Sequence, residues 1–222
     1  MALSKDIIRE LEDVVGEEFI CCDPAIMPSY HGSDLGAVVL PENTAQVQAI
    51  VKTCNKYKLQ FSAVATGWTG SFKKDIVYLD MRRMNRIIEI NEKNMYAVIE
   101  PYVITAELQA ECFKKGLHFN VKGAGSNCSA MLRGHGHLDQ STSGDDRNHL
   151  AIEWVTPEGE IVRSGALGST DEWFCGDGPG PSIRAILTSA VPPGVTPGVF
   201  TKAAIKLYHW AGPPRYDIQG LS

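Results

Sequence analysis

Two short apolar segments separated by one amphipathic segment place the strongest limit on how this chain can fold. Residues 37–40 form an apolar run that Pro41 ends, and residues 61–65 form a second run. Between them Asn43 can cap a helix, because apolar residues follow it at helical spacing, at Val47, Ile50, Val51, Cys54 and Tyr57. Strand, helix and strand in this order predict a βαβ unit.

The rest of the chain predicts a mixture of helices and short strands. Ser4 can cap a first helix that Gly16 ends, and Thr105 can cap a helix that runs to Phe113 and that Gly116 ends. Further strands are expected at residues 76–80, 87–90, 96–100 and 203–208, a hairpin at 153–162 with its turn at 157–159, and a short helix at 182–189. These elements indicate the α+β class.

A loop that contains two glycines follows the second strand of the βαβ unit, at residues 66–71. Glycines let consecutive backbone N–H groups face an anion, and the hydroxyls of Thr66, Thr69 and Ser71 add donors, so the loop suits a pyrophosphate. An ordinary turn between two strands is the alternative. The segment is neither a GxGxxG fingerprint nor a Walker loop.

Residues 122–148 form a long polar segment rich in Gly, Ser, Asp, Asn and His. Long loops of this kind usually bind something, so a glycine-rich ligand loop is the favoured interpretation. Two alternatives remain open: a solvated polar loop, or a metal site in which His135 and His137 share one ion with Asp139 nearby. No third firm metal ligand is evident.

Two glycine-containing motifs near the end of the chain allow a structural or a functional interpretation. Residues 176–182 are typical of a tight corner before a helix capped by Ser182. In residues 197–207, a glycine before an apolar strand allows a flat ligand to approach the backbone, or simply starts the strand.

Charge and composition exclude several classes of protein. The net charge of −5 argues against a nucleic-acid partner, and no apolar run is long enough for a membrane span. The first residues lack a signal-peptide core, and the six cysteines are scattered, with Cys54 and Cys112 at apolar helix positions, which predicts a cytoplasmic protein with buried thiols. The nucleophile motifs of hydrolases are also lacking.

Four stretches, taken in order, resemble a known family. Residues 37–51, 77–90, 153–162 and 198–207 are similar to landmarks of the PCMH-type FAD-binding domain that vanillyl alcohol oxidase, glycolate oxidase and D-lactate dehydrogenase share. The resemblance implies an α+β domain of two lobes with FAD stretched between them. The expected divisions are a lead-in at residues 1–35, lobes at 36–94 and 95–210, and a tail at 211–222.

The resemblance also implies where FAD would be bound, without a covalent link. The diphosphate would lie on residues 66–71. Residues of the polar segment would line either the diphosphate or the flavin side of the cofactor. Ile161 would meet the adenine end, and Val199 would approach the flavin. The implied contacts are Thr66, Gly67, Trp68, Thr69, Gly70, Ser71, Ser126, Asn127, Gly134, Gly136, Ile161 and Val199. No metal ligand and no catalytic residue is implied.

The function implied is that of an FAD-dependent dehydrogenase subunit or fragment, in which substrate hydride passes to flavin N5. Because the family closes its flavin with a C-terminal cap domain, other subunits are expected to supply the cap or the electron acceptor, with apolar tail residues Trp210, Tyr216 and Ile218 helping to dock them. The chain is then not active alone. The competing hypothesis is a noncatalytic scaffold in a heteromeric complex, since Thr66 stands where the family usually has arginine.

Overall fold

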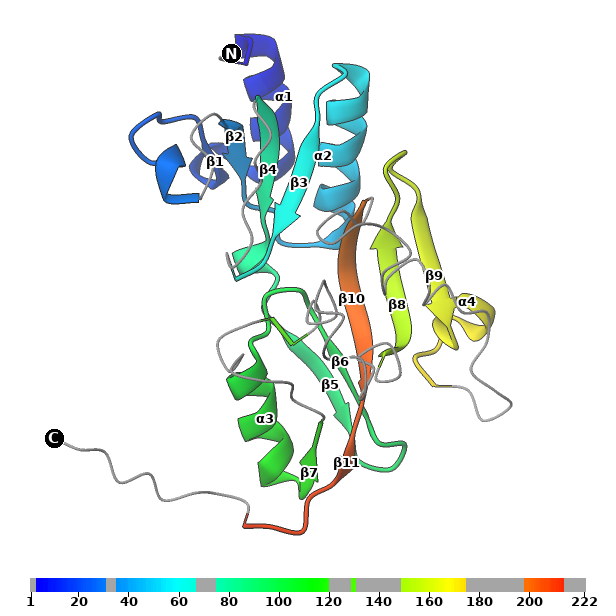
Figure 1. Cartoon of the computed structure of the whole chain (residues 1–222). Helices are drawn as coiled ribbons and strands as arrows, with labels where there is room; N and C mark the ends of the chain where they lie inside the picture. Colours follow the sequence, from blue (N-terminus) through cyan, green and yellow to red (C-terminus); the bar gives the residue numbers. More distant parts are fainter. Residues whose placement is uncertain are drawn as a thin grey trace, which may run out of the picture.

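The computed structural model contains two large β-sheets with helices packed on them, and a third sheet of two short strands (Figure 1). It describes residues 3–30, 35–66, 75–119, 129–130, 149–174 and 198–213. No helix within these ranges has the length and apolar character that crossing a bilayer requires. The arrangement confirms the expected α+β class and its two lobes.

The first sheet is built around the predicted βαβ unit. Its strands are β1 (Ile20–Cys21), β2 (Leu35–Val39), β4 (Ile76–Asp80) and β3 (Phe61–Val64), in that spatial order. Strands β2, β4 and β3 are parallel, and helix α2 (Thr44–Lys56) connects β2 to β3 across β4. Asn43 caps α2 by accepting a hydrogen bond from the backbone N–H of Gln46, at 2.9 Å.

Alternating side chains of this sheet enter two different cores. Val39, Val77 and Leu79 pack against α2 and α1 (Lys5–Val15), whose N-cap is Ser4 as predicted. Val38 and Tyr78 face the opposite side, toward the 3₁₀ helix η2 (Met27–Tyr30). A second 3₁₀ helix, η1 (Glu17–Phe19), follows α1, and a third, η3 (Met81–Arg83), follows β4.

The second sheet is antiparallel throughout. Its strands lie in the order β5 (Ile87–Asn91), β6 (Tyr96–Ile99), β10 (Val199–Lys206), β8 (His149–Val155) and β9 (Ile161–Gly165). Helix α3 (Thr105–Lys114) covers one face, and α4 (Leu167–Thr170) packs on the other (Figure 1). The strands β7 (Leu117–His118) and β11 (Tyr208–His209) pair beside α3.

Two elements differ in detail from what the sequence predicts. The expected first lobe, residues 36–94, includes strand β5. In the structure β5 hydrogen-bonds to β6 and so belongs to the second sheet, and the boundary between the two sheets falls between β4 and β5. Thr105 is the first residue of α3 rather than its cap, because Ile104 occupies that position. The helix expected at 182–189 lies outside the described residues.

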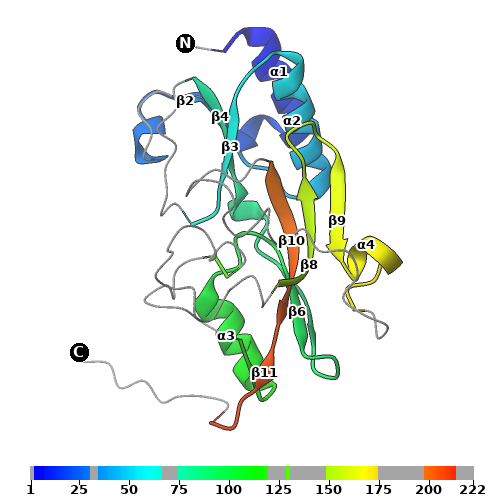
Figure 2. The same cartoon turned by 45° about the vertical axis from the view of Figure 1, so that its right-hand side comes forward.

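Helix α2 joins the two lobes. The hairpin β8–β9 reaches up beside it in both views (Figures 1 and 2). Val155 and Val199 of the second sheet are buried in the same core as α2. The Gln48 amide donates to the carbonyl of Gly159, at 2.7 Å, and the Asn55 amide donates to the carbonyl of Pro157, at 2.8 Å. The lobes therefore share a packed and hydrogen-bonded interface.

The buried thiols give a direct test of this packing. Burial raises the pKa of Cys54 and of Cys112 to about 12, so at pH 8 only about one molecule in 10⁴ carries either thiolate. We expect a thiol-reactive aromatic disulfide to label half-buried Cys21 in the folded protein well before Cys54 or Cys112. Peptide mass spectrometry would locate the label, and equal labelling of the three would contradict the packing.

Candidate functional site

The carboxyl ends of β3 and β4 lie side by side at one edge of the first sheet. Val64 of β3 is in register with Asp80 of β4, and Thr66 follows β3 by two residues. In open sheets with parallel strands, ligands commonly bind beyond the carboxyl ends. The edge is therefore where a ligand of this lobe would be sought.

Thr66 connects this edge to the second lobe. Its hydroxyl oxygen accepts a hydrogen bond from the backbone N–H of Ser129, at 3.3 Å, and the Ser129 hydroxyl donates to the carbonyl of Pro101, at 2.5 Å. The N–H of Ala130 donates to the carbonyl of Val103, at 2.8 Å. Thr66 is the first residue of the predicted diphosphate loop, and Ser129 belongs to the polar segment at residues 122–148, so this contact joins one described residue of each.

A fixed group of polar side chains lies at the end of β4. Asp80 is 1% exposed and lies 2.5 Å from a terminal nitrogen of Arg82, which also donates to the hydroxyl of Tyr30, at 3.2 Å. Burial, together with the charge of Asp80, raises the pKa of Tyr30 to about 12, so the phenol stays protonated at neutral pH. Half of the Arg82 side chain is exposed, and its guanidinium is paired with the buried carboxylate of Asp80.

Arg82 and Ser129 were not among the residues predicted from the sequence. Arg82 was detectable in principle, because an arginine two residues after a strand-ending aspartate lies at the same sheet edge as the loop after the neighbouring strand. Ser129 had no such signal, because its contact with Thr66 joins residues far apart in the chain.

Ile161 and Val199 come together, but in different environments. Both pair with Val155, from opposite sides of β8. Ile161 is 39% exposed on the edge strand β9, whereas the Val199 side chain is buried in the core. Gly198 has a positive φ of 85°, and a Cβ there would lie 2.3 Å from the carbonyl oxygen of Val155. This glycine therefore allows close packing of two strands at the start of β10.

The remaining predicted contacts lie outside the described residues. They are Gly67, Trp68, Thr69, Gly70, Ser71, Ser126, Asn127, Gly134 and Gly136, together with His135 and His137 of the alternative metal site. The described part of the chain brings together the residues that flank them, Thr66 and Ser129.

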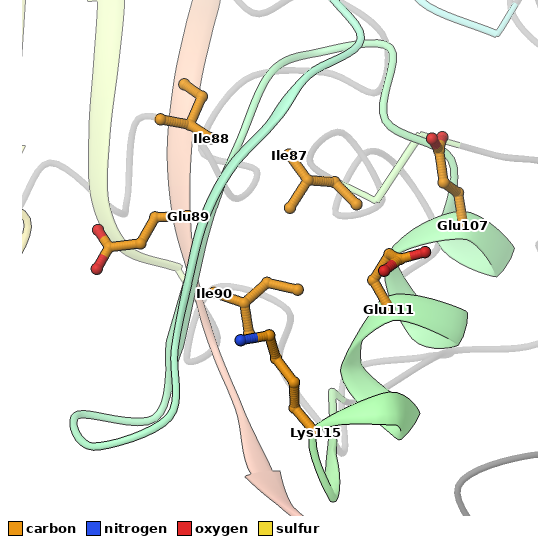
Figure 3. Close-up of a pocket in the computed structure, with 7 residues that line it drawn as sticks. All are labelled: Ile87, Ile88, Glu89, Ile90, Glu107, Glu111 and Lys115. Carbon is orange, nitrogen blue, oxygen red and sulfur yellow. The ribbon is translucent and has the colours of Figure 1, made fainter.

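An open depression lies between β5 and α3 (Figure 3). Ile87 and Ile90 face the helix, where Glu107 and Glu111 project from α3. The full lining is Ile87, Ile88, Glu89, Ile90, Glu107, Glu111 and Lys115. It contains no predicted cofactor contact.

Glu153 is a buried carboxylate between the lobes. Its side chain is 4% exposed and receives hydrogen bonds from Thr44 of α2, at 2.7 Å, and from Thr201, at 3.1 Å, Lys202, at 2.8 Å, and Arg163, at 3.2 Å, of the second sheet. Burial by itself would raise the pKa of Glu153. The bonds from Lys202, Thr44 and Thr201 outweigh burial, so the pKa lies below its usual value and the group is ionised at neutral pH.

This lowered pKa predicts acid sensitivity. Ionised Glu153 contributes stability above the unfolded-state pKa of 4.5, and the contribution is lost as the pH falls through the lower folded-state pKa. We expect the difference in unfolding free energy between the wild type and Glu153→Gln to be constant near neutral pH and to shrink below pH 4.5. Urea titrations across this range would measure it, and a difference that grows on acidification would contradict the assignment.

Trp210, expected to help dock a partner, packs within the chain. Its ring lies 4.6 Å from that of Phe113 on α3 and 5.7 Å from that of His118, and its indole N–H donates to the carbonyl of Pro213. Tyr216 and Ile218 lie outside the described residues.

A sequence family described as "FAD binding domain" matches residues 36–165, which is more than half of the chain. The matched range begins at β2 and ends with β9, so it includes the sheet edge, Thr66, Ser129 and Glu153.

Individual proteins agree with this match. D-2-hydroxyglutarate dehydrogenase of Stutzerimonas stutzeri is 32% identical over 57% of this chain and 29% of its own length. The flavoprotein subunit of 4-cresol dehydrogenase [hydroxylating] from Pseudomonas putida is 27% identical over 69% of this chain and 32% of its own. The structure of 4-ethylphenol oxidase from Gulosibacter chungangensis superposes with a TM-score of 0.75 at 27% identity, over 92% of this chain and 42% of that one. This chain thus spans about a third of the curated relatives it matches.

Proposed function

This chain belongs to the family of FAD-binding domains found in flavin-dependent oxidoreductases, and from that premise we propose that it binds FAD without a covalent bond. The hydrogen bond from Ser129 to Thr66 carries the proposal, because it joins the two segments that contain most of the predicted contacts. The site lies at the carboxyl edge of β3 and β4, where parallel strands commonly place a nucleotide.

The described residues at this edge fit a ligand that carries a diphosphate. On a chain with a net charge of −5, an anionic ligand needs local donors and positive charge. Arg82 has a half-exposed side chain that Asp80 and Tyr30 hold in place, and Thr66 leads into the glycine-containing loop. We propose that residues 66–71 hold the diphosphate, with Ser126, Asn127, Gly134 and Gly136 beside it.

Bound FAD would supply a flavin ring that accepts hydride from the substrate at N5. The chain's own part is to orient the cofactor and keep water from it, and we assign no residue of this chain a proton-transfer role. Tyr30 fits that view, because a phenol with a pKa of about 12 beside a fixed ion pair is a poor base.

We further propose that the substrate is bound by structure outside these 222 residues, either on other subunits or elsewhere in a longer polypeptide. The relatives extend well beyond the part this chain matches. The name of the 4-cresol dehydrogenase relative calls it a flavoprotein subunit, which supports the proposal of assembly with another subunit. By this proposal the chain alone does not turn over substrate.

One observation favours the second candidate, a noncatalytic scaffold. The Val199 side chain, expected near the flavin, is buried in the core, and the space at Gly198 is filled by Trp154 and Val155. For either function we propose a cytoplasmic location, because the four described cysteines carry free thiols, which a reducing compartment preserves.

Isolation of the protein from its native source would test these proposals together. We expect FAD in the purified material, released into the supernatant on acid precipitation, and at least one co-purifying chain or a longer polypeptide. Flavin that stays with the precipitate would contradict noncovalent binding. A complex without flavin would favour the scaffold.

A further inference from the structure

Several polar contacts join the lobes: the bond from Ser129 to Thr66, at 3.3 Å, involves two neutral groups, whereas the bond from Thr44 ends on the buried carboxylate of Glu153. The amide bonds from Gln48 and Asn55 end on backbone carbonyls of the hairpin turn, and the ion pair between Lys52 and Glu160 is long, at 3.9 Å, and exposed. Interactions of exposed groups contribute little, whereas the bonds of a buried carboxylate are strong and directional.

The bonds of Glu153 divide unequally between the lobes. Thr201, Lys202 and Arg163 all belong to the second sheet, as Glu153 does, and only Thr44 belongs to the first lobe. Thr44 is the first residue of α2, so the carboxylate also lies at the positive end of that helix. The Thr44 hydroxyl is therefore the group through which the Glu153 carboxylate bonds to the first lobe.

The elements on either side of this bond lead to the proposed cofactor contacts. Helix α2 runs directly into β3, which ends before Thr66, and the hairpin that contains Glu153 contains Ile161 on its second strand. A change in the docking of α2 on the hairpin would move these two contacts relative to each other. A ligand that spans both lobes loses affinity when the site is no longer preorganised.

We propose that Glu153 is a positioning residue: through Thr44 it fixes α2, and with it the Thr66 edge, against the second sheet. The consequence for FAD rests on the proposed function, whereas the docking itself does not.

Two isosteric substitutions separate positioning from general stabilisation. Thr44→Val and Thr201→Val each remove one hydroxyl bond to the same carboxylate oxygen, Oε1 of Glu153. Only Thr44→Val removes a bond between the lobes. Thr201→Val is therefore the matched control, and both variants leave Lys202 and Arg163 to hold the charge.

The first readout needs no cofactor. A carbodiimide forms a zero-length amide between Lys52 of α2 and Glu160 of the hairpin, whose side chains are both exposed. The amide between Lys56 and Glu10, within the first lobe, is the internal reference. We expect Thr44→Val to reduce the Lys52–Glu160 yield severalfold relative to that reference, and Thr201→Val to leave it unchanged. Equal yields in the two variants would overturn the proposal.

The second readout is the dissociation constant of FAD. We expect Thr44→Val to weaken binding by about tenfold and Thr201→Val by less than about twofold. Equal weakening, or none in either variant, would overturn the positioning role. If the two variants give the expected cross-link yields but the wild-type chain binds no FAD, the proposed function is refuted, while the cross-link yields still support Glu153 as the residue that docks α2.

Discussion

Replacement of Gly67 by aspartate is expected to abolish FAD binding, with a loss in affinity of at least about 100-fold, or about 2.7 kcal/mol. Gly67 follows Thr66, whose hydroxyl oxygen is bonded to Ser129 at the sheet edge. In a loop that presents backbone N–H groups to a diphosphate, a side chain fills the space that glycine leaves, and its negative charge repels the ligand.

A matched aspartate elsewhere separates this effect from a general effect of charge. Gly116, after α3, has a positive φ of 67°, and no atom lies within 4 Å of where its Cβ would be. Gly116→Asp adds the same side chain far along the chain from the loop and is expected to leave FAD affinity unchanged. Fluorescence titration of FAD would compare the two, and unchanged binding by a folded Gly67→Asp protein would count against the loop assignment.

Substitution of Gly165 by alanine is expected to destabilise the fold by about 3 to 5 kcal/mol. Gly165 ends β9 with a positive φ of 73°, and a Cβ there would lie 2.0 Å from the carbonyl oxygen of Leu150 and 2.8 Å from the Cα of Ala151. Both are backbone atoms of β8, so β9 must move away from its partner strand. Backbone hydrogen bonds of the hairpin would then be lost.

Gly116→Ala is the control, because it imposes a similar backbone strain without a collision. Its expected cost is about 1 kcal/mol. Urea unfolding followed by circular dichroism gives both values. Similar losses of unfolding free energy in the two variants would contradict the prediction, because they would mean that β9 accommodates the Cβ without moving away from β8.

Local sequence signals were sufficient for much of this fold. Asn43 and Ser4 cap helices as predicted, because capping depends on residues within one turn. The hairpin of β8 and β9 was also predicted, because two apolar segments on either side of a Pro-Glu-Gly turn specify it locally.

What the sequence did not predict depends on contacts between distant segments. β5 and β6 are neighbours in the chain, but they belong to the second sheet because β6 pairs with β10, which lies about a hundred residues further on, and no local pattern states that pairing. Glu153 looked like one more residue of a strand, because its bond to Thr44 spans 109 positions. The sequence did not decide whether Gly198 makes room for a ligand or only starts a strand. The structure shows that Trp154 and Val155 occupy the space beside it.

The candidate site follows the same division. The glycine loop after β3 was found from its composition and position, whereas Ser129, which joins that loop to the second lobe, was not. The family resemblance supplied the order of the landmarks, and residues 36–165 confirm the family.

The central claim is that this chain binds FAD between its two lobes, and titration of the purified, flavin-free chain with FAD tests it most directly. We predict saturable binding of one FAD per chain, seen as a perturbed flavin absorption near about 450 nm, with complete release of the flavin on denaturation. A chain whose circular dichroism shows the folded α+β structure but which leaves the flavin spectrum unchanged at every concentration would contradict the account.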